Sequence, residues 1–178
     1  MPSHSASPSS LPSTPRALQL IEQLQLQPHP EGGWYREVFR SAGEVTPQDG
    51  RPSRSALTSI YFLLEAAQHS RWHRVLSDEV WVHLEGAPLE LWTWDAADSR
   101  LHGEVLGPVS AATLPQHVVA AGLWQAAHPQ GGDASAGFTL VACMVGPGFD
   151  FADFQMMAPD GSEARSIAAD HPQLAPLI

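Results

Sequence analysis

Hydrophobic and polar residues alternate in several short runs of this chain. In residues 79–84, every second position is occupied by Glu79, Trp81 or His83, and the positions between them are occupied by three aliphatic residues. Side chains of a β-strand point alternately to its two faces, so this run predicts a strand with one aliphatic face and one face carrying an acid, an indole and an imidazole. Such a face is typical of a lined pocket. An ordinary half-buried hairpin whose histidine faces water gives the same pattern.

Further strands are predicted around this one. Gly86 and Pro88 break the run, and residues 89–94 read as the returning strand of a hairpin. Turn residues separate the remaining strand-like runs, which are 34–41, 57–64, 101–106, 118–119, 123–127 and 138–145. Many short strands without helical periodicity between them indicate an all-β fold, an antiparallel sandwich or barrel.

Helical periodicity is confined to the two ends of the chain. Thr14 and Pro15 suit an N-cap and a first helical position, which predicts a short amphipathic helix over about 15–26. Near the other end, Asp160 is a candidate cap for a short helix over about 162–169.

Composition and charge narrow the organisation and the class of function. Residues 1–13 are rich in Ser and Pro, which predicts a disordered tail before a single domain over 14–178. The net charge of −10 argues against a nucleic-acid partner, because such an acidic chain lacks a basic stripe. No apolar span approaches the roughly 20 residues of a membrane helix, and the N-terminus does not resemble a signal peptide. We therefore expect a cytoplasmic protein without a membrane partner, in which Cys143 is a small buried hydrophobe.

Ionisable residues gather just before and at the start of the 79–84 strand. Arg71, His73, Arg74 and Glu79 lie close to an otherwise apolar strand, where charged groups are costly unless they are used. His73 and Glu79 are therefore the pair for which we favour a function. His29, in contrast, precedes a proline and is expected to shape a turn together with Glu31.

Several sequence blocks resemble the fifth cupin family, a group of small proteins without a settled activity. They are HPEGGWYREVFRS (29–41), TSIYFLL (58–64), SRWHRVLSDEVWVHLEG (70–86), AGLWQAA (121–127) and VGPGFDFADF (145–154). The resemblance spans about residues 15–157. It implies a double-stranded β-helix, the cupin jelly-roll barrel, with a central pocket and usually a homodimeric assembly. It does not imply a particular reaction, because this fold hosts many.

Metal-binding cupins carry their ligands in two motifs, which this chain keeps only in part. Glu79 stands in the right relation to Gly86, and His73 can stand for the second histidine. Arg71 replaces the first histidine and Gln125 the last, and neither is a good ligand. A divalent transition metal is therefore not favoured. If one binds, the implied ligands are His73, Glu79 and Gln125, completed by His83.

A second, weaker resemblance concerns deoxythymidine-diphosphate-sugar 3,5-epimerases. In that family an Arg-Gly-Leu-His segment supplies a histidine base and an arginine that helps to hold phosphates; here Arg71-Trp72-His73 has the same order with one residue fewer. The resemblance implies that His73 is a base and that Arg71 or Arg74 holds an anion. The candidates for an acid on the opposite face are Tyr35, Tyr61 and Glu79.

Three functions stay open at this point. The first is a metal-independent isomerase or epimerase-like enzyme acting on a small anionic sugar or nucleotide-like molecule, with His73 and Glu79 as catalytic residues. The second is a non-catalytic binding protein for a small molecule, and the third is a metal-dependent cupin enzyme. For all three we expect a small-molecule partner, a homodimer, and one set of ligand-binding residues: Arg71, Arg74, Tyr35, Tyr61, Trp81, His83, Trp124 and Gln125.

Overall fold

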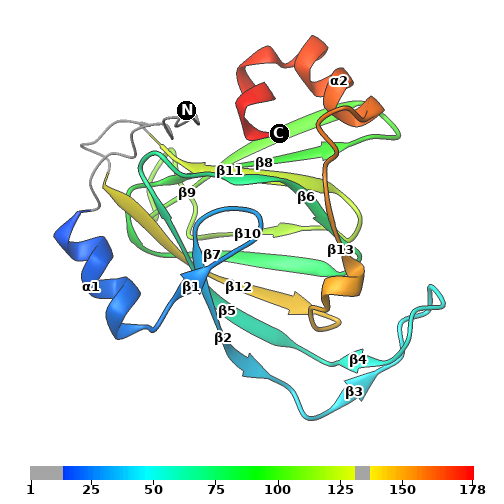
Figure 1. Ribbon diagram of the computed structural model, residues 1–178, viewed down its shortest axis with the longest axis horizontal. Helices are drawn as coiled ribbons and strands as arrows, with labels where there is room; N and C mark the ends of the chain where they lie inside the picture. Colours follow the sequence, from blue (N-terminus) through cyan, green and yellow to red (C-terminus); the bar gives the residue numbers. More distant parts are fainter. Residues whose placement is uncertain (1–13, 131–136) are drawn as a thin grey trace, which may run out of the picture.

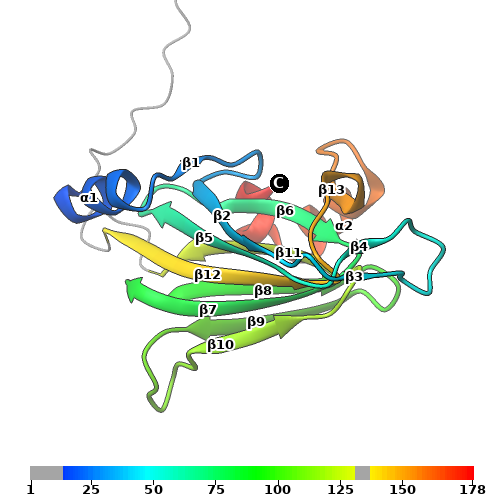
Figure 2. The ribbon, with the colours of Figure 1, turned by 90° about the horizontal axis from the view of Figure 1, so that it is seen from below.

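Two antiparallel β-sheets packed face to face form the body of the protein (Figure 1). The computed structural model describes residues 14–130 and 137–178, so the predicted tail over 1–13 lies outside the described residues. The sheets enclose the core as two layers (Figure 2). The prediction of an all-β jelly-roll barrel with a short helix near each end is confirmed.

The order of strands in each sheet is far from their order in the sequence. The first sheet contains, from edge to edge, β1 (Gln27–Pro28), β2 (Trp34–Arg40), β5 (Thr58–Glu65), β12 (Phe138–Gly146), β7 (Asp78–Gly86) and β10 (Gln116–Val119). The second contains β13 (Phe154–Met156), β6 (Ser70–Val75), β11 (Trp124–Pro129), β8 (Leu89–Asp95) and β9 (Arg100–Leu106). A small ribbon of β3 (Glu44–Val45) and β4 (Arg54–Ser55) projects from the end of the barrel (Figure 1).

The predicted hairpin of β7 and β8 is wrong, although both strands exist. β7 pairs with β12 and β10, whereas β8 pairs with β11 and β9. The connection after Gly86 therefore carries the chain from one sheet to the other. Gly86 has φ +95°, and a Cβ on it would lie 2.2 Å from the carbonyl oxygen of Phe138, so only glycine fits this crossing.

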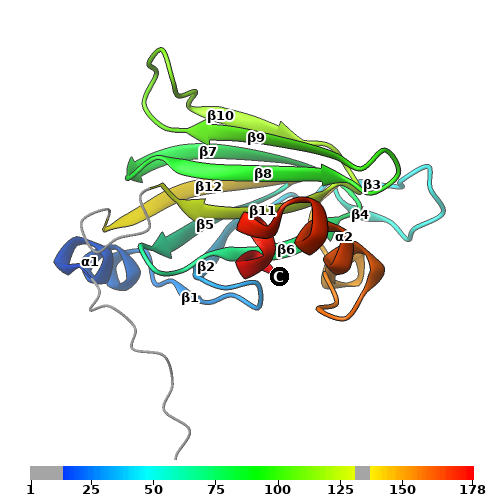
Figure 3. The ribbon, with the colours of Figure 1, turned by 90° about the horizontal axis from the view of Figure 1, so that it is seen from above.

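The two sheets bury one core between them, and helices cover their outer faces. Phe62, Trp81 and Val141 from the first sheet pack against Leu91 and Ala127 from the second. The helix α1 (Pro15–Gln23) covers the outside of the first sheet, and α2 (Ser162–Asp170) with the 3₁₀ helix η2 (Pro172–Leu177) covers the second (Figure 3). Neither α-helix in the described ranges is long and apolar enough to cross a membrane.

The helix ends follow the predicted capping only in part. The Thr14 hydroxyl accepts a hydrogen bond from the Ala17 backbone at 3.2 Å, as an N-cap does. The helix ends at Gln23, earlier than predicted, because the chain turns at Gln25, which has φ +54°. At α2 the N-cap is Gly161, so the expectation that Asp160 caps this helix is wrong.

Candidate functional site

A cavity of about 310 Å³ lies between the sheets, a size at the lower end of the range for small-molecule sites. Its lining comes from β2, β5, β7 and β12 of the first sheet, from β6 of the second, and from the two segments that precede β2 and follow β12. The lining residues are Gln27, His29, Glu31, Tyr35, Glu37, Arg40, Thr58, Ile60, Phe62, His73, Glu79, Cys143, Val145, Phe149, Asp150 and Phe151.

His73, on β6, presents an unprotonated nitrogen to this cavity. Its Nδ1 lies 2.7 Å from the carbonyl oxygen of Arg71, and because a carbonyl only accepts, Nδ1 carries the proton. The neutral ring then has its lone pair on Nε2. That atom lies 3.1 Å from Nε2 of Gln125 and 3.3 Å from Oε2 of Glu31. The side chain is fully buried, so neighbouring groups decide its protonation.

Gln125, on β11, links His73 to Glu79. The indole Nε1 of Trp81 donates to Gln125 Oε1 at 3.1 Å, which fixes the orientation of the amide group. The amide nitrogen then donates to Glu79 Oε2 at 2.6 Å and points its second hydrogen at His73. All four side chains are buried, so this chain of hydrogen bonds is shielded from bulk water.

Glu31 approaches His73 from the turn before β2. Its Oε1 accepts from the Ser70 hydroxyl at 2.8 Å, while its Oε2 lies 3.5 Å from Nδ1 of His29. That Nδ1 accepts the backbone N–H of Glu31, so it also presents a lone pair. A carboxyl oxygen that faces lone pairs on His29 and His73 is stabilised only when it carries a proton.

Burial shifts all four ionisable groups toward their neutral forms. Desolvation raises the pKa of Glu31 to about 8 and that of Glu79 to about 7. Desolvation, with the neighbouring His73, lowers the pKa of His29 to about 4, and it also lowers the pKa of His73. The contacts of Glu31 with the two imidazoles are therefore contacts between neutral groups rather than ion pairs.

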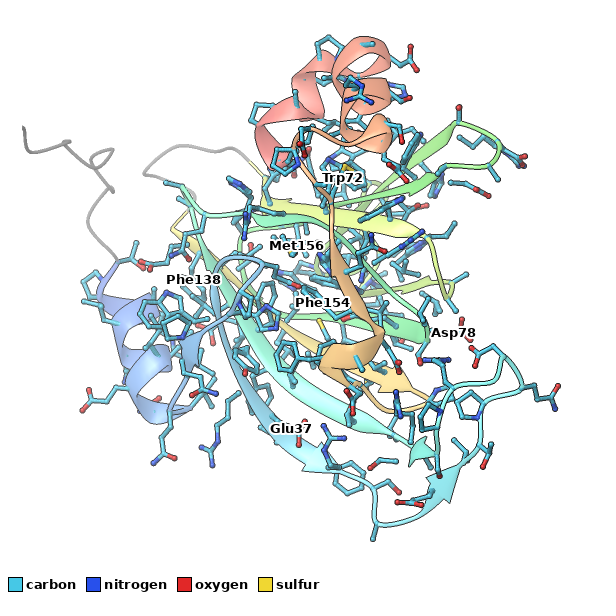
Figure 4. All side chains as sticks on the ribbon, turned by 45° about the vertical axis from the view of Figure 1, so that its right-hand side comes forward. Glu37, Trp72, Asp78, Phe138, Phe154 and Met156 are labelled. Atoms are coloured by element: carbon cyan, nitrogen blue, oxygen red, sulfur yellow. The ribbon has the colours of Figure 1, made fainter. Side chains whose placement is uncertain are left out.

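Aromatic rings form the walls around these polar groups. Tyr35 meets the His29 ring edge-on at 4.5 Å, and Phe62 approaches His29 at 5.9 Å. Phe154, on β13, lies 5.4 Å from the His73 ring and appears in the centre of Figure 4. Phe151 is about half exposed and stacks on His29 at 6.4 Å. The cavity thus combines flat apolar walls with a few convergent polar groups.

The structure brings together five of the residues expected in the site. His73, Glu79 and Tyr35 line the cavity. Gln125 is hydrogen-bonded to His73 and Glu79, and Trp81 is hydrogen-bonded to Gln125.

Five other expected residues lie outside the lining, which corrects their predicted placement. Arg71 donates to the carbonyl oxygen of Pro30, and Arg74 donates to Gln155 while its guanidinium lies over Trp124. Tyr61 packs in the cluster beneath α1, and His83 is bonded to the carbonyl oxygen of Ala87. Trp124 packs beneath the C-terminal helices. Strand alternation explains why three of these side chains point away from the cavity. Each is adjacent in sequence to a residue that faces the barrel interior: Arg74 to His73, Tyr61 to Phe62, and Trp124 to Gln125.

His29 and Glu31 belong to a turn, as expected from the sequence, and in addition both line the cavity, which was not expected. The glycines after them provide the reason. Gly32 has φ +114°, and a Cβ there would lie 2.2 Å from the carbonyl oxygen of His69. This close approach lets the Glu31 carbonyl accept the backbone N–H of Arg71 at 2.9 Å, which holds the turn against β6. The pair of glycines beside two ionisable residues was the available signal.

The residues present do not fit the reduced metal site considered from the sequence. Over residues 14–130 and 137–178, no three His, Cys, Asp or Glu side chains are arranged to hold a metal ion. Gln125 cannot complete such a set, because its oxygen accepts from Trp81 and its NH₂ group faces the other two side chains. A cation repels N–H groups that point at it.

Comparison with known proteins agrees with this fold and with the motifs around the cavity. Residues 18–157 match the family model described as Cupin superfamily (DUF985). The chain belongs to this cupin family. No curated protein matches the chain.

Two solved structures resemble this one over nearly the whole length of both chains. A hypothetical protein from Leishmania major is 36% identical, with 91% of this chain and 96% of that chain covered and a TM-score of 0.75. A protein from Shewanella oneidensis is 33% identical, with 90% and 93% covered and a TM-score of 0.73. Oxalate decarboxylase from Bacillus subtilis shares only the fold, at 12% identity and a TM-score of 0.53 over 86% of this cupin and 37% of that chain.

Proposed function

We propose that this cupin binds a small, uncharged, ring-containing polar molecule such as a sugar and catalyses an isomerase or epimerase-like proton transfer on it. The observation that carries the proposal is His73, whose Nδ1 proton is held by the Arg71 carbonyl while Nε2 is left as a base beside the cavity. A buried imidazole with a lowered pKa stays neutral at pH 7, as a general base requires.

The carboxyl groups of the site supply the matching acid. Glu79 lines the cavity, and its pKa of about 7 lies near the working pH, where a group both gives and takes a proton readily. Glu31, protonated at this pH, contacts His73 Nε2. In the proposed reaction His73 removes a proton from a carbon next to a carbonyl group, and Glu79 donates one to the developing oxyanion.

The charges of the lining favour an uncharged ligand over the anion expected from the sequence. Arg71 and Arg74, on which that expectation rested, lie outside the lining. Arg40 is the one Lys or Arg among the lining residues, and its guanidinium is bonded to both carboxylate oxygens of Glu37, at 3.0 and 2.7 Å. An anion would have to compete with Glu37 for that guanidinium.

A non-catalytic binding protein is the second candidate, and one contact favours it. The Gln125 amide points an N–H at His73 Nε2 at 3.1 Å, which occupies the lone pair that a base needs. In a pure binding site this contact is permanent. In an enzyme the substrate displaces it.

Solvent exchange separates the two candidates without knowledge of the full reaction. Keto and aldo sugars are incubated with the protein in D₂O, and loss of the C–H signal next to the carbonyl is followed by proton NMR. We expect exchange with the natural protein, at least a 100-fold slower rate with His73→Asn, and no change with His102→Asn, which removes an exposed imidazole. Calorimetric binding of a sugar by the natural protein without exchange would favour the non-catalytic candidate.

We also propose that the protein is a homodimer, paired along the edge of the first sheet. β1 covers only the start of β2, and Val38 and Phe39, on its uncovered part, are about half exposed. Light scattering at micromolar concentration should give twice the mass of the chain. A monomeric mass would contradict this proposal.

A further inference from the structure

The amide group of Gln125 lies where two potential metal-ligand atoms converge. Its nitrogen is 3.1 Å from Nε2 of His73 and 2.6 Å from Oε2 of Glu79. An imidazole nitrogen and a carboxylate oxygen are the atoms with which proteins bind zinc and similar ions. Here both atoms accept hydrogen bonds from one NH₂ group instead.

The orientation of that amide is fixed by its environment. Trp81 offers only a donor, and its Nε1–H points at Gln125 Oε1 at 3.1 Å. If the amide were reversed, its NH₂ group would face the indole N–H, and its oxygen would face the lone pairs of Glu79 and His73. Trp81, His73 and Gln125 are each at most 2% exposed, so bulk water would not compensate the lost hydrogen bonds.

We propose that the Gln125 amide takes the place of a metal ion in this barrel, with its two N–H groups linking His73 and Glu79, and that this single side chain keeps the cavity free of metal. A donor at position 125 repels a cation, whereas a ligand atom there would complete a set of three. The proposal concerns how the site is held together. It stands whether or not the cavity is catalytic.

Two substitutions change the donor into a ligand. Gln125→His places a second imidazole beside His73 and Glu79. The three side chains can then hold one metal ion and leave its fourth coordination position open to the cavity, as in catalytic zinc sites. Gln125→Glu is nearly isosteric with the natural residue. One of its oxygens can still accept from Trp81, while the other replaces the NH₂ group.

The test is titration of metal-stripped full-length protein with Co²⁺, followed by calorimetry and by the visible absorption of bound cobalt. We expect the natural protein to bind Co²⁺ no more tightly than His73→Asn does, since any remaining affinity comes from surface histidines. Gln125→His or Gln125→Glu should gain one equivalent of Co²⁺ at least 100-fold tighter, with visible absorption, and adding His73→Asn should remove that gain.

Two results would overturn the proposal. One is a stoichiometric Co²⁺ site in the natural protein that His73→Asn abolishes. The other is that neither Gln125→His nor Gln125→Glu gains tighter Co²⁺ binding that depends on His73, although circular dichroism shows that at least one of the two variants is folded. The isosteric Gln125→Glu guards against loss of folding in the bulkier variant.

Discussion

The carboxyl group of Glu31 lies against the imidazole of His73, with 3.3 Å between Oε2 and Nε2. The two residues belong to different parts of the barrel, since Glu31 stands in the turn before β2 and His73 in the middle of β6. Each group is shifted toward its neutral form by burial. Because the buried carboxyl group of Glu31 holds its proton to a higher pH than a carboxyl group in the unfolded chain does, the stability of the fold depends on pH.

We predict that the free energy of unfolding falls as the pH rises from 6.5 to 8. In this range the folded protein keeps protons on Glu31 and Glu79 that the unfolded chain has lost. The protons that His29 and His73 bind only in the unfolded chain act in the opposite direction, but the unfolded imidazoles are only about half protonated at pH 6.5 and lose these protons as the pH rises, so this offset is smaller. The folded state therefore binds more protons, and stability decreases by about 1.4 kcal/mol per pH unit for each group while its folded form is protonated. Urea denaturation should show a decrease of about 2 kcal/mol over this range.

Substitution identifies the carboxyl groups that are responsible. Glu31→Gln should remove most of the decrease between pH 7 and 8, because Glu79 has already titrated near pH 7. Glu22→Gln, on the exposed side of α1, should leave the pH dependence as it is. If Glu31→Gln showed the full decrease, Glu31 would not be the protonated group in the folded protein.

The turn that carries His29 and Glu31 should tolerate no side chain at Gly32. Gly32→Ala places a Cβ 2.2 Å from the carbonyl oxygen of His69 at φ +114°, so we expect a loss of about 3 kcal/mol of stability in urea denaturation. The matched control is Gly50→Ala, where φ is +87° but no atom lies within 4 Å of the new Cβ. That variant should lose only about 1 kcal/mol. Equal losses would show that crowding against His69 does not hold the turn.

Asp153 should anchor the segment at the mouth of the cavity. It accepts hydrogen bonds from Arg51 at 2.8 Å and from Arg54 at 2.9 Å, and it belongs to the 3₁₀ helix η1 (Phe151–Asp153). Asp153→Asn leaves the largely buried guanidinium of Arg54 without its carboxylate partner and leaves Arg51 with Asp49 alone, which should cost about 3 kcal/mol at pH 7.

An exposed ion pair provides the control for this effect. Asp98→Asn removes the partner of Arg100 at the surface and should cost far less stability in thermal or urea unfolding than Asp153→Asn does.

Hydrogen bonds from Arg54 and Arg51 lower the pKa of Asp153 in the folded protein. The stabilisation by Asp153 is therefore present at neutral pH and is lost as the pH falls below the ordinary pKa of an aspartate. A loss for Asp153→Asn no larger than for Asp98→Asn would exclude the anchoring role.

Alternation along strands accounts for the part of the site that the sequence predicts. Glu79 and Trp81 share a parity and both face the barrel interior, and the neighbours His73 and Arg74 necessarily lie on opposite faces of β6. The alternation of residues does not show which face of a strand points into the barrel. The inward face depends on which sheet the strand joins, and the predicted pairing of β7 with β8 is wrong because these two strands belong to different sheets.

Turn residues lie beyond the reach of such periodicity. His29 and Glu31 enter the cavity because their turn contacts β6 and the chain before it, and this contact depends on the positive φ of Gly32 and on the three-dimensional path of the chain. The role of Gln125 was visible from its motif position only as a poor metal ligand. The Gln125 NH₂ group faces His73 and Glu79 because the Trp81 indole donates to the amide oxygen. Trp81 lies in the other sheet, so the sequence does not reveal this contact.

The protonation of His73 is the most direct test of the proposed chemistry. Long-range ¹H–¹⁵N correlation spectra of the imidazole groups, assigned with His73→Asn, report the protonated nitrogen and the pKa of the ring. We predict a neutral ring at pH 7 with the proton on Nδ1, an acceptor at Nε2, and a pKa below the ordinary histidine value. A proton on Nε2, or a pKa above that value, would contradict the assignment of His73 as the base.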